Sequence, residues 1–283
     1  MDVLDKFRAL KPILHIVVLS MLLLQVNGRL LKAQPAELSC GDVPSGTAEA
    51  VTDDYVLVWS DECDTDGSID TTKWFRQTKL PMADSWHNNE IQHYTDRDAN
   101  SFNDSGYMHI MAKKEIYTDQ GHTKTYTSAR LNSKFAFTYG KVEVRAQLPA
   151  GEGTWPAIWM LGADHKSPGS YWHSRVSGTT PWPDCGEIDI MEHWGTNQDY
   201  VSSAIHNRSS FGSTFNKGGR EVPDASTEFH VYALEWAPEK LVFSIDDTVH
   251  YTYQPDEKNR NTWPFDKDFY ILLNVAVLPG ISA

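Results

Sequence analysis

Residues 231–253, VYALEWAPEKLVFSIDDTVHYTY, determine the fold class that we expect for this chain. Apolar side chains alternate with other residues up to Trp236 and again through 241–245, and the alternation returns after Asp246-Asp247. A two-residue period is typical of strands that bury one face, and an acidic pair between two such runs indicates a turn. The stretch therefore predicts an antiparallel hairpin.

Two other segments extend this pattern. Residues 141–148, KVEVRAQL, alternate cleanly between apolar and polar side chains, as a half-buried strand does. Residues 269–277, FYILLNVAV, are almost continuously apolar, which is typical of a strand covered on both faces. No segment after residue 33 shows sustained helical periodicity, so we predict one all-β domain built as an antiparallel sandwich or barrel.

Composition narrows the possible functions. The chain has 283 residues with 40% hydrophobic and 22% charged side chains, a balance that excludes a disordered or fibrous protein. Its 38 acidic against 25 basic residues give a net charge of −13, which repels phosphate backbones, so we expect no nucleic-acid partner. With 10 Trp and 12 Tyr, the aromatic side chains serve either as core or as flat surfaces on which sugars stack.

The N-terminal region predicts export. Basic residues precede an apolar run at 13–26 that is too short to span a bilayer, and a small-residue cleavage site follows at Ala33. We therefore predict a signal peptide over 1–33, a linker over 34–50 and a catalytic domain over 51–283, with an uncleaved anchor as the alternative. The mature protein is expected to be a secreted, extracellular monomer without stable membrane insertion, or a periplasmic or surface-anchored one.

The three cysteines, Cys40, Cys63 and Cys185, allow at most one internal disulfide, and Cys185 is expected to be a small buried side chain.

The acidic stretch 187–192, EIDIME, indicates chemistry. In a strand, Glu187 and Asp189 point to one face, and a one-residue bulge near Met191 would bring Glu192 to the same face. Because neighbouring like charges cannot all stay ionised cheaply, one carboxyl group should keep its proton, which suits an acid and a nucleophile acting together on a glycosidic bond. The alternatives are an exposed acidic strand edge and a cation site.

Residues 187–192 resemble the E-x-D-x-x-E signature of glycoside hydrolase family 16 in its bulged form. Together with the preceding WPDCG at 182–186, they are most similar to the laminarinase branch of that family, the endo-1,3-β-glucanases. The likeness runs in order from about Asp53 to Val277 and includes four other stretches: VWSDE at 58–62, NNEIQHYT at 88–95, YTSARL at 126–131 and GTWPAIWML at 153–161.

The resemblance implies a concanavalin-like jelly-roll sandwich with a sugar cleft across its concave sheet. It also implies retaining endo-hydrolysis of β-1,3-glucosidic bonds in laminarin-type β-glucans, with a polysaccharide substrate and no required cofactor. In that scheme Glu187 is the nucleophile, Glu192 is the acid/base and Asp189 tunes their protonation. A structural calcium held in part by Glu62 is implied as well.

Further residues resemble sugar-binding positions of the family. Trp155 and Trp159 are four residues apart and would share a strand face, with burial in the core as the alternative. The full set of expected substrate-binding residues is Trp155, Trp159, Arg130, Asn89, Glu90, His206 and Trp194. For the polar members, ordinary surface or structural roles are the alternatives. Trp236 alternates with the core face and is expected to pack there.

Residues 278–283 differ from the family, in which a Gly-rich loop with a Trp follows the strand at 274–277. We therefore expect a sandwich that lacks its C-terminal strands, which would expose an unpaired edge.

The alternatives to a laminarinase-like function are a hydrolase of another β-glycan (mixed-linkage glucan, agar or carrageenan), a non-catalytic glucan-binding protein and a non-functional fragment. The presence of both Glu187 and Glu192 disfavours a purely binding role.

Overall fold

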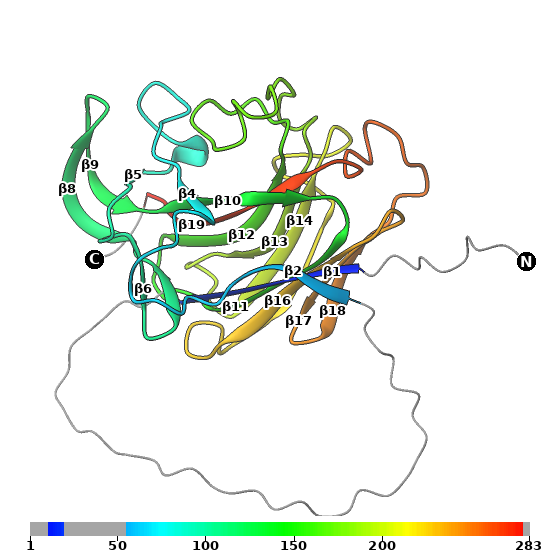
Figure 1. Cartoon of the computed structure of the whole chain (residues 1–283), viewed down its shortest axis with the longest axis horizontal. Coiled ribbons are helices and arrows are strands. Elements are labelled where there is room, and N and C mark those ends of the chain that lie inside the picture. Colours follow the sequence, from blue (N-terminus) through cyan, green and yellow to red (C-terminus); the bar gives the residue numbers. More distant parts are fainter. Residues whose placement is uncertain (1–10, 20–54, 280–283) are drawn as a thin grey trace, which may run out of the picture.

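The computed structural model describes residues 11–19 and 55–279, which form two large β-sheets packed face to face and a small third sheet at one end (Figure 1). The only described helix is one 3-10 turn at His87–Asn89. The prediction of an all-β antiparallel sandwich is confirmed, with two exceptions: β1 (Lys11–Leu19) in one large sheet and β5 (Gln92–Tyr94) in the small sheet pair in parallel with their neighbours.

Sheet A has the order β18-β17-β16-β11-β1-β7-β6-β3, with β2 also paired to β1. Its strands are β1 (Lys11–Leu19), β2 (Tyr55–Asp61), β3 (Gly67–Ser68), β6 (Ser101–Asp104), β7 (Tyr107–Ile110), β11 (Gly140–Gln147), β16 (His230–Trp236), β17 (Leu241–Ile245) and β18 (Thr248–Tyr253).

Sheet B has the order β15-β14-β13-β12-β19-β10-β4, and the small sheet C has the order β5-β9-β8. The strands of sheet B are β4 (Trp74–Arg76), β10 (Arg130–Phe137), β12 (Thr154–Gly162), β13 (Glu187–His193), β14 (Tyr200–His206), β15 (Lys217–Glu221) and β19 (Phe269–Val277). Those of sheet C are β5 (Gln92–Tyr94), β8 (Lys113–Asp119) and β9 (His122–Ser128), and the β8–β9 hairpin projects at one end of the molecule (Figure 1).

The hydrophobic core lies between sheets A and B. All nine residues of β19 are buried, as its apolar run predicts, because the strand lies inside sheet B between β12 and β10. Trp236 is also buried in this core, and the side chains of Cys63 and Cys185 are buried as well. The predicted hairpin is confirmed as β17–β18, where Asp246 and Asp247 adopt φ of 48° and 59°. Two successive positive φ angles match the right-handed twist of a two-residue hairpin turn.

Strand β1 runs parallel to β11, β2 and β7 in sheet A. It falls within residues 1–33, where we predict a signal peptide, and cleavage after Ala33 would remove it from the sheet. The rest of that segment, the linker at 34–50 and Cys40 lie outside the described residues. The signal peptide and the absence of C-terminal strands after β19 therefore stay predictions. Among the described residues, no helix is long and apolar enough to cross a membrane.

Candidate active site

The acidic residues of β13 lie on the open face of sheet B, and a β-bulge brings them there. Asp189 pairs with Trp159 of β12, but the next pair along joins Met191 to Ile158, so β13 carries one extra residue at this point. The pairing with β14 shifts between Asp189 and Glu192 in the same way. Ile190 and Met191 are both buried in the core as a result, which returns Glu192 to the cleft face. The predicted bulge is confirmed.

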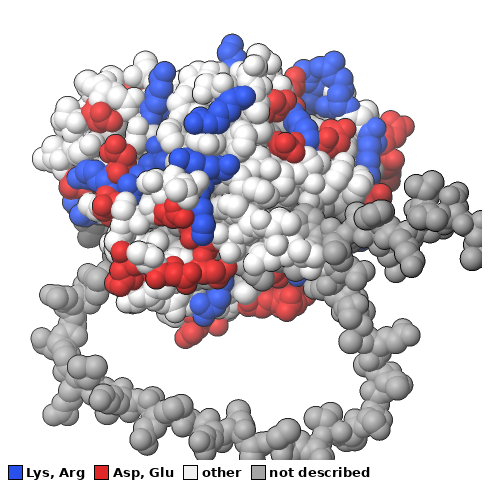
Figure 2. Space-filling view, in the orientation of Figure 1, with Lys and Arg blue, Asp and Glu red and all other residues white. Residues whose placement is uncertain are grey.

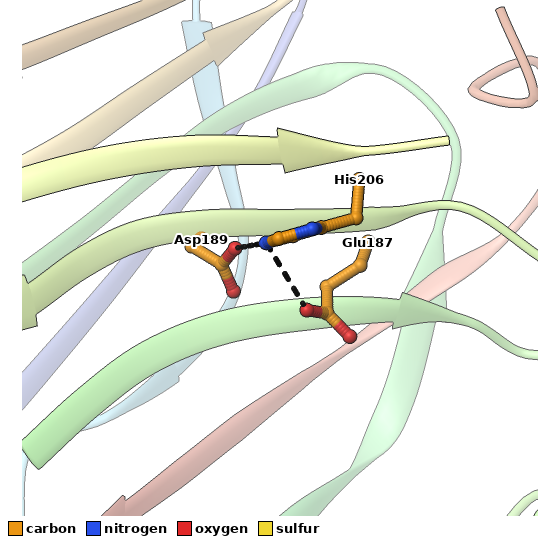
Figure 3. A group of neighbouring side chains, drawn as sticks. All are labelled: Glu187, Asp189 and His206. Atoms are coloured by element: carbon orange, nitrogen blue, oxygen red, sulfur yellow. Dashed lines mark ion pairs between the residues drawn. The ribbon is translucent and has the colours of Figure 1, made fainter. Parts of the chain in front are cut away.

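His206, at the end of β14, faces two of the three carboxylates (Figure 3). Its Nε2 lies 3.1 Å from Asp189 Oδ2 and 3.7 Å from Glu187 Oε1. The backbone N–H of Gly212 donates a hydrogen bond of 3.1 Å to His206 Nδ1. Because Nδ1 is thereby an acceptor, the neutral ring carries its hydrogen on Nε2, between the two carboxylates.

Each catalytic candidate accepts one hydrogen bond from an indole. Trp182 Nε1 donates to Glu187 Oε2, and Trp155 Nε1 donates to Glu192 Oε1, both over 3.1 Å. Such bonds favour the ionised form of the acceptor and hold the carboxyl group in one orientation. Glu187 also has His206 Nε2 at 3.7 Å from its Oε1, a second nitrogen beside this carboxylate, and a charge on His206 partly offsets the rise that burial causes in the pKa of both glutamates.

Burial works against these charges. Desolvation, together with the nearby charge of Asp189, raises the pKa of Glu187 to about 8 and that of Glu192 to about 8. Desolvation raises the pKa of Asp189 as well. Because the three groups are coupled, they share protons near neutral pH instead of ionising together. Near neutral pH the cluster therefore holds at least one protonated carboxyl group beside an ionised one, and chemistry with an acid and a nucleophile requires such a pair.

The raised pKa values predict a pH-dependent cost to stability. A carboxyl group with a pKa of 4.5 when unfolded and about 8 when folded keeps its proton longer in the folded state. The free energy of unfolding therefore falls as pH rises between these two values. We expect Glu192→Gln, which cannot ionise, to melt a few degrees above the wild type at pH 8 and to lose this advantage below pH 4.5. Calorimetric melts of both proteins between pH 4 and 8 would measure the difference, and a difference that does not change with pH would contradict the prediction.

The three carboxylates form part of the wall of a cleft with a cavity volume of about 400 Å³. Most of the predicted substrate-binding residues line it, namely Trp155, Trp159, Arg130 and Glu90. Trp194 is 38% exposed and stacks on Trp155, with ring centroids 4.3 Å apart, so one face of Trp155 is already covered. The cavity lining includes Asn88 but not the predicted Asn89, which is exposed.

Arg130 and Trp159 form a packed pair in the cleft. The Arg130 guanidinium lies 4.5 Å from the ring centroid of Trp159 and 5.2 Å from that of Trp86, and its Nε donates to Gln77 Oε1. A cation held over an indole face stabilises both side chains in place. Trp159 thus lies at the cleft wall, as predicted, and not in the core.

Several cleft residues were missed by the sequence analysis. They come from segments distant in the chain: Trp86, His165 and Asn274. Trp182 belongs to the stretch that resembles the family signature, and its position next to the acidic residues was a usable signal that it reaches the site. No sequence motif marks the other three residues, because the strands and loops that carry them meet at the cleft only in the folded chain.

A metal role is not favoured by the contacts. Among the described residues, the one group of at least three metal-ligating side chains is Glu187, Asp189 and His206, and it does not include Glu62. His206 Nε2 carries a hydrogen there and cannot also be a ligand. Glu62 is exposed in the loop that follows β2, and calcium takes six to eight oxygen ligands, which can come from distant parts of the chain. A structural calcium held in part by Glu62 stays a prediction.

Charged side chains of both signs lie on the face shown in Figure 2. Asp and Glu gather along the lower edge, and Lys and Arg lie mostly above them, mixed with further acidic side chains. The absence of a nucleic-acid partner stays a prediction.

Comparisons with known proteins agree with this site. The sequence matches the model of Glycosyl hydrolases family 16 over residues 86–280. It is 41% identical over 233 residues to a beta-glucanase of Rhodothermus marinus, and this match covers 79% of the present chain and 76% of the relative. It is 34% identical over 241 residues to a glucan endo-1,3-beta-glucosidase of Cryptopygus antarcticus, and that match covers 79% of the present chain and 80% of the relative.

The fold is likewise similar to a solved structure. The crystal structure of LamA_E269S from Z. galactanivorans in complex with laminaritriose and laminaritetraose superposes with a TM-score of 0.73 at 44% identity. The match covers 80% of this chain and 91% of that one. The family match extends over more than half of the chain and includes the strand that carries Glu187 and Glu192, so this chain belongs to glycosyl hydrolases family 16.

Proposed function

We propose that the protein is a retaining endo-hydrolase of β-1,3-glucosidic bonds in laminarin-type glucans, with Glu187 as nucleophile and Glu192 as acid/base. The observation that carries this proposal is the bulged strand β13, which presents both glutamates to one cleft with an indole N–H bonded to each. Retaining glycosidases need two carboxyl groups that flank the scissile bond, about 5–5.5 Å apart and in unequal protonation states.

The surroundings support this division of roles. Glu187 has two hydrogen-bearing nitrogens beside its carboxylate, from Trp182 and His206, and these stabilise the charge that a nucleophile needs. Among the described residues, the Glu192 carboxyl group accepts a hydrogen bond from the Trp155 indole alone, so we assign the proton-carrying role to Glu192. Asp189 lies 3.1 Å from His206 Nε2 and holds that ring beside the carboxylate of Glu187.

In the first step, Glu187 attacks the anomeric carbon while the glycosidic C–O bond breaks and the leaving oxygen takes the proton of Glu192. This produces a glycosyl ester of Glu187 and an ionised Glu192. In the second step, Glu192 removes a proton from water, the water oxygen attacks the anomeric carbon, and the bond to Glu187 breaks. Both glutamates then return to their starting states.

The substrate class is supported by the relatives, which are named as a beta-glucanase and a glucan endo-1,3-beta-glucosidase, and by the laminari-oligosaccharides in the similar crystal structure. Indole faces in the cleft suit the apolar faces of pyranose rings. Another β-glycan hydrolase remains the alternative that differs least, since its chemistry would use the same carboxylates.

The test is hydrolysis of laminarin followed by proton NMR, which distinguishes the anomers of newly formed ends before they equilibrate. We expect β-anomers to appear first and chains to shorten from internal bonds. Early α-anomers would show inversion and overturn the role of Glu187. Release of sugar from agar or mixed-linkage glucan but not from laminarin would overturn the substrate.

We also propose that the enzyme is exported, because its N-terminal segment combines basic residues with a short apolar run. Sequencing the N-terminus of the protein recovered outside the cell tests this. A start at Gln34 would support the proposal, and a start at residue 1 or 2 would contradict it.

A further inference from the structure

A continuous chain of side-chain hydrogen bonds runs beneath the cleft wall and links two of its sugar-facing residues. Trp159 Nε1 donates to Asn274 Oδ1 over 2.7 Å, and Asn274 Nδ2 donates to the hydroxyl oxygen of Tyr94 over 3.2 Å. The Tyr94 hydroxyl in turn donates to Glu90 Oε2 over 3.0 Å. Trp159 and Glu90 line the cavity, whereas Tyr94 does not. Asn274 lines the cavity as well. Trp159 and Asn274 are therefore joined to Glu90 through a residue that does not line it.

The direction of these bonds is determined at both ends. An indole N–H can only donate, so the oxygen of the Asn274 amide must face Trp159 and its NH₂ group must face Tyr94. The Tyr94 hydroxyl accepts that bond, so its own hydrogen goes to Glu90. Both bonds to Glu90 use Oε2, which leaves Oε1 to accept a hydroxyl group from a ligand in the cleft.

The chain is also anchored to the backbone. Gln92 Nε2 donates to Glu90 Oε2 over 2.7 Å, and Gln92 Oε1 accepts the backbone N–H of Val277 over 2.8 Å. Tyr94 and Gln92 are fully buried, and Glu90 is 7% exposed. In such surroundings a broken hydrogen bond leaves a buried polar atom without a partner, so the chain behaves as a unit.

Packing also fixes the Tyr94 ring. It lies edge-on to Trp86, with ring centroids 4.7 Å apart. Trp86 in turn lies against the Arg130 guanidinium, which is 5.2 Å from its ring centroid. Removing only the hydroxyl oxygen would therefore keep the ring in place and interrupt the chain at one point.

We propose that Tyr94 is a positioning residue for glucan recognition, which holds Glu90 and, through Asn274, the indole of Trp159 in their binding orientations. The assignment of glucan as the ligand rests on the function proposed above. Tyr94 acts through its two neighbours and makes no contact with the sugar.

The matched variants are Tyr94→Phe and Tyr232→Phe. Both tyrosines are fully buried, but the Tyr232 hydroxyl has no hydrogen-bond partner among the described residues and does not line the cleft. Losing one net hydrogen bond of about 1 kcal/mol changes an equilibrium about fivefold. We expect Tyr94→Phe to raise KM for laminarihexaose about fivefold with kcat changed less than twofold, and Tyr232→Phe to change neither.

A second measurement needs no substrate. In proteins labelled with ¹⁵N-tryptophan, the Trp159 indole signal is identified by its loss in Trp159→Phe, and its hydrogen-exchange rate is measured. We expect Tyr94→Phe to speed exchange of the Trp159 Nε1–H severalfold and Tyr232→Phe to leave it unchanged. A merely structural role for Tyr94 would lower the melting temperature without either effect.

The outcomes separate this proposal from the proposed function. An unchanged Trp159 signal together with an unchanged KM in folded Tyr94→Phe would overturn the positioning role. Faster Trp159 exchange in a protein that does not bind laminarihexaose would support the positioning role and overturn the glucan assignment. If Tyr94→Phe does not fold, Gln92→Met interrupts the anchor on the other side of Glu90, and an unchanged KM there would overturn the proposal.

Discussion

Glu187→Ser is expected to abolish hydrolysis, with a loss in kcat on the order of 10⁴-fold or more, because no other group can form the covalent bond to the anomeric carbon. Ser is shorter than Glu and its hydroxyl is not ionised at neutral pH. The cleft walls remain in place, since the main partner lost is the indole of Trp182. Binding of laminarihexaose, measured by calorimetry, should therefore persist while turnover disappears.

The matched control is Glu235→Ser, at an exposed position of β16 in the opposite sheet. It should keep wild-type turnover. Substantial hydrolysis by Glu187→Ser would contradict the nucleophile assignment, and loss of both binding and a cooperative melt would show that Glu187 is needed for folding.

Glu192→Ala is expected to lower kcat on laminarin about 10²- to 10⁴-fold, because the leaving sugar oxygen loses its proton donor. A 2,4-dinitrophenyl β-laminaribioside needs no such proton, since dinitrophenolate is a good leaving group. With that substrate the first step should stay fast and the second should slow, so one equivalent of dinitrophenolate per enzyme should appear as a burst.

Stopped-flow absorbance measures this burst directly. Equal losses on laminarin and on the dinitrophenyl substrate, without a burst, would contradict the acid/base assignment. Glu221→Ala, at an exposed position of β15 in the same sheet, is the control and should behave like the wild type.

The acidic strand shows how far sequence periodicity reaches. A two-residue period places Glu187 and Asp189 on one face, and only a bulge can add Glu192 to them. The need for that bulge could be inferred from the sequence, because Ile190 and Met191 are both apolar and both suit the core. The pairing of β13 with β12 and β14 confirms it.

The surroundings of these carboxylates were less predictable. Trp155 was expected as a free stacking surface, but it donates to Glu192 and is covered on one face by Trp194. Trp182 was not identified as a site residue, although it donates to Glu187. In both cases the residue type was informative, but the direction of the indole N–H depends on side chains that arrive from other strands.

The sequence by itself determined the strand pattern, the buried strand β19, the hairpin β17–β18 and the shared face of Glu187, Asp189 and Glu192. These features follow from the period of the backbone and the polarity of adjacent residues, which are local properties. Secretion, the monomeric state and the calcium site stay predictions.

Only the tertiary structure decided which side chains meet at the cleft. Trp159 and Asn274 are 115 residues apart in the chain, and Gln92 bonds to a backbone group 185 residues away. Such contacts depend on the order of strands in sheet B and on the loops around it, and a local pattern contains neither. Glu187 and Glu192 can be identified from the sequence, but the packing of distant strands determines their pKa values and the side chains that line the cleft around them.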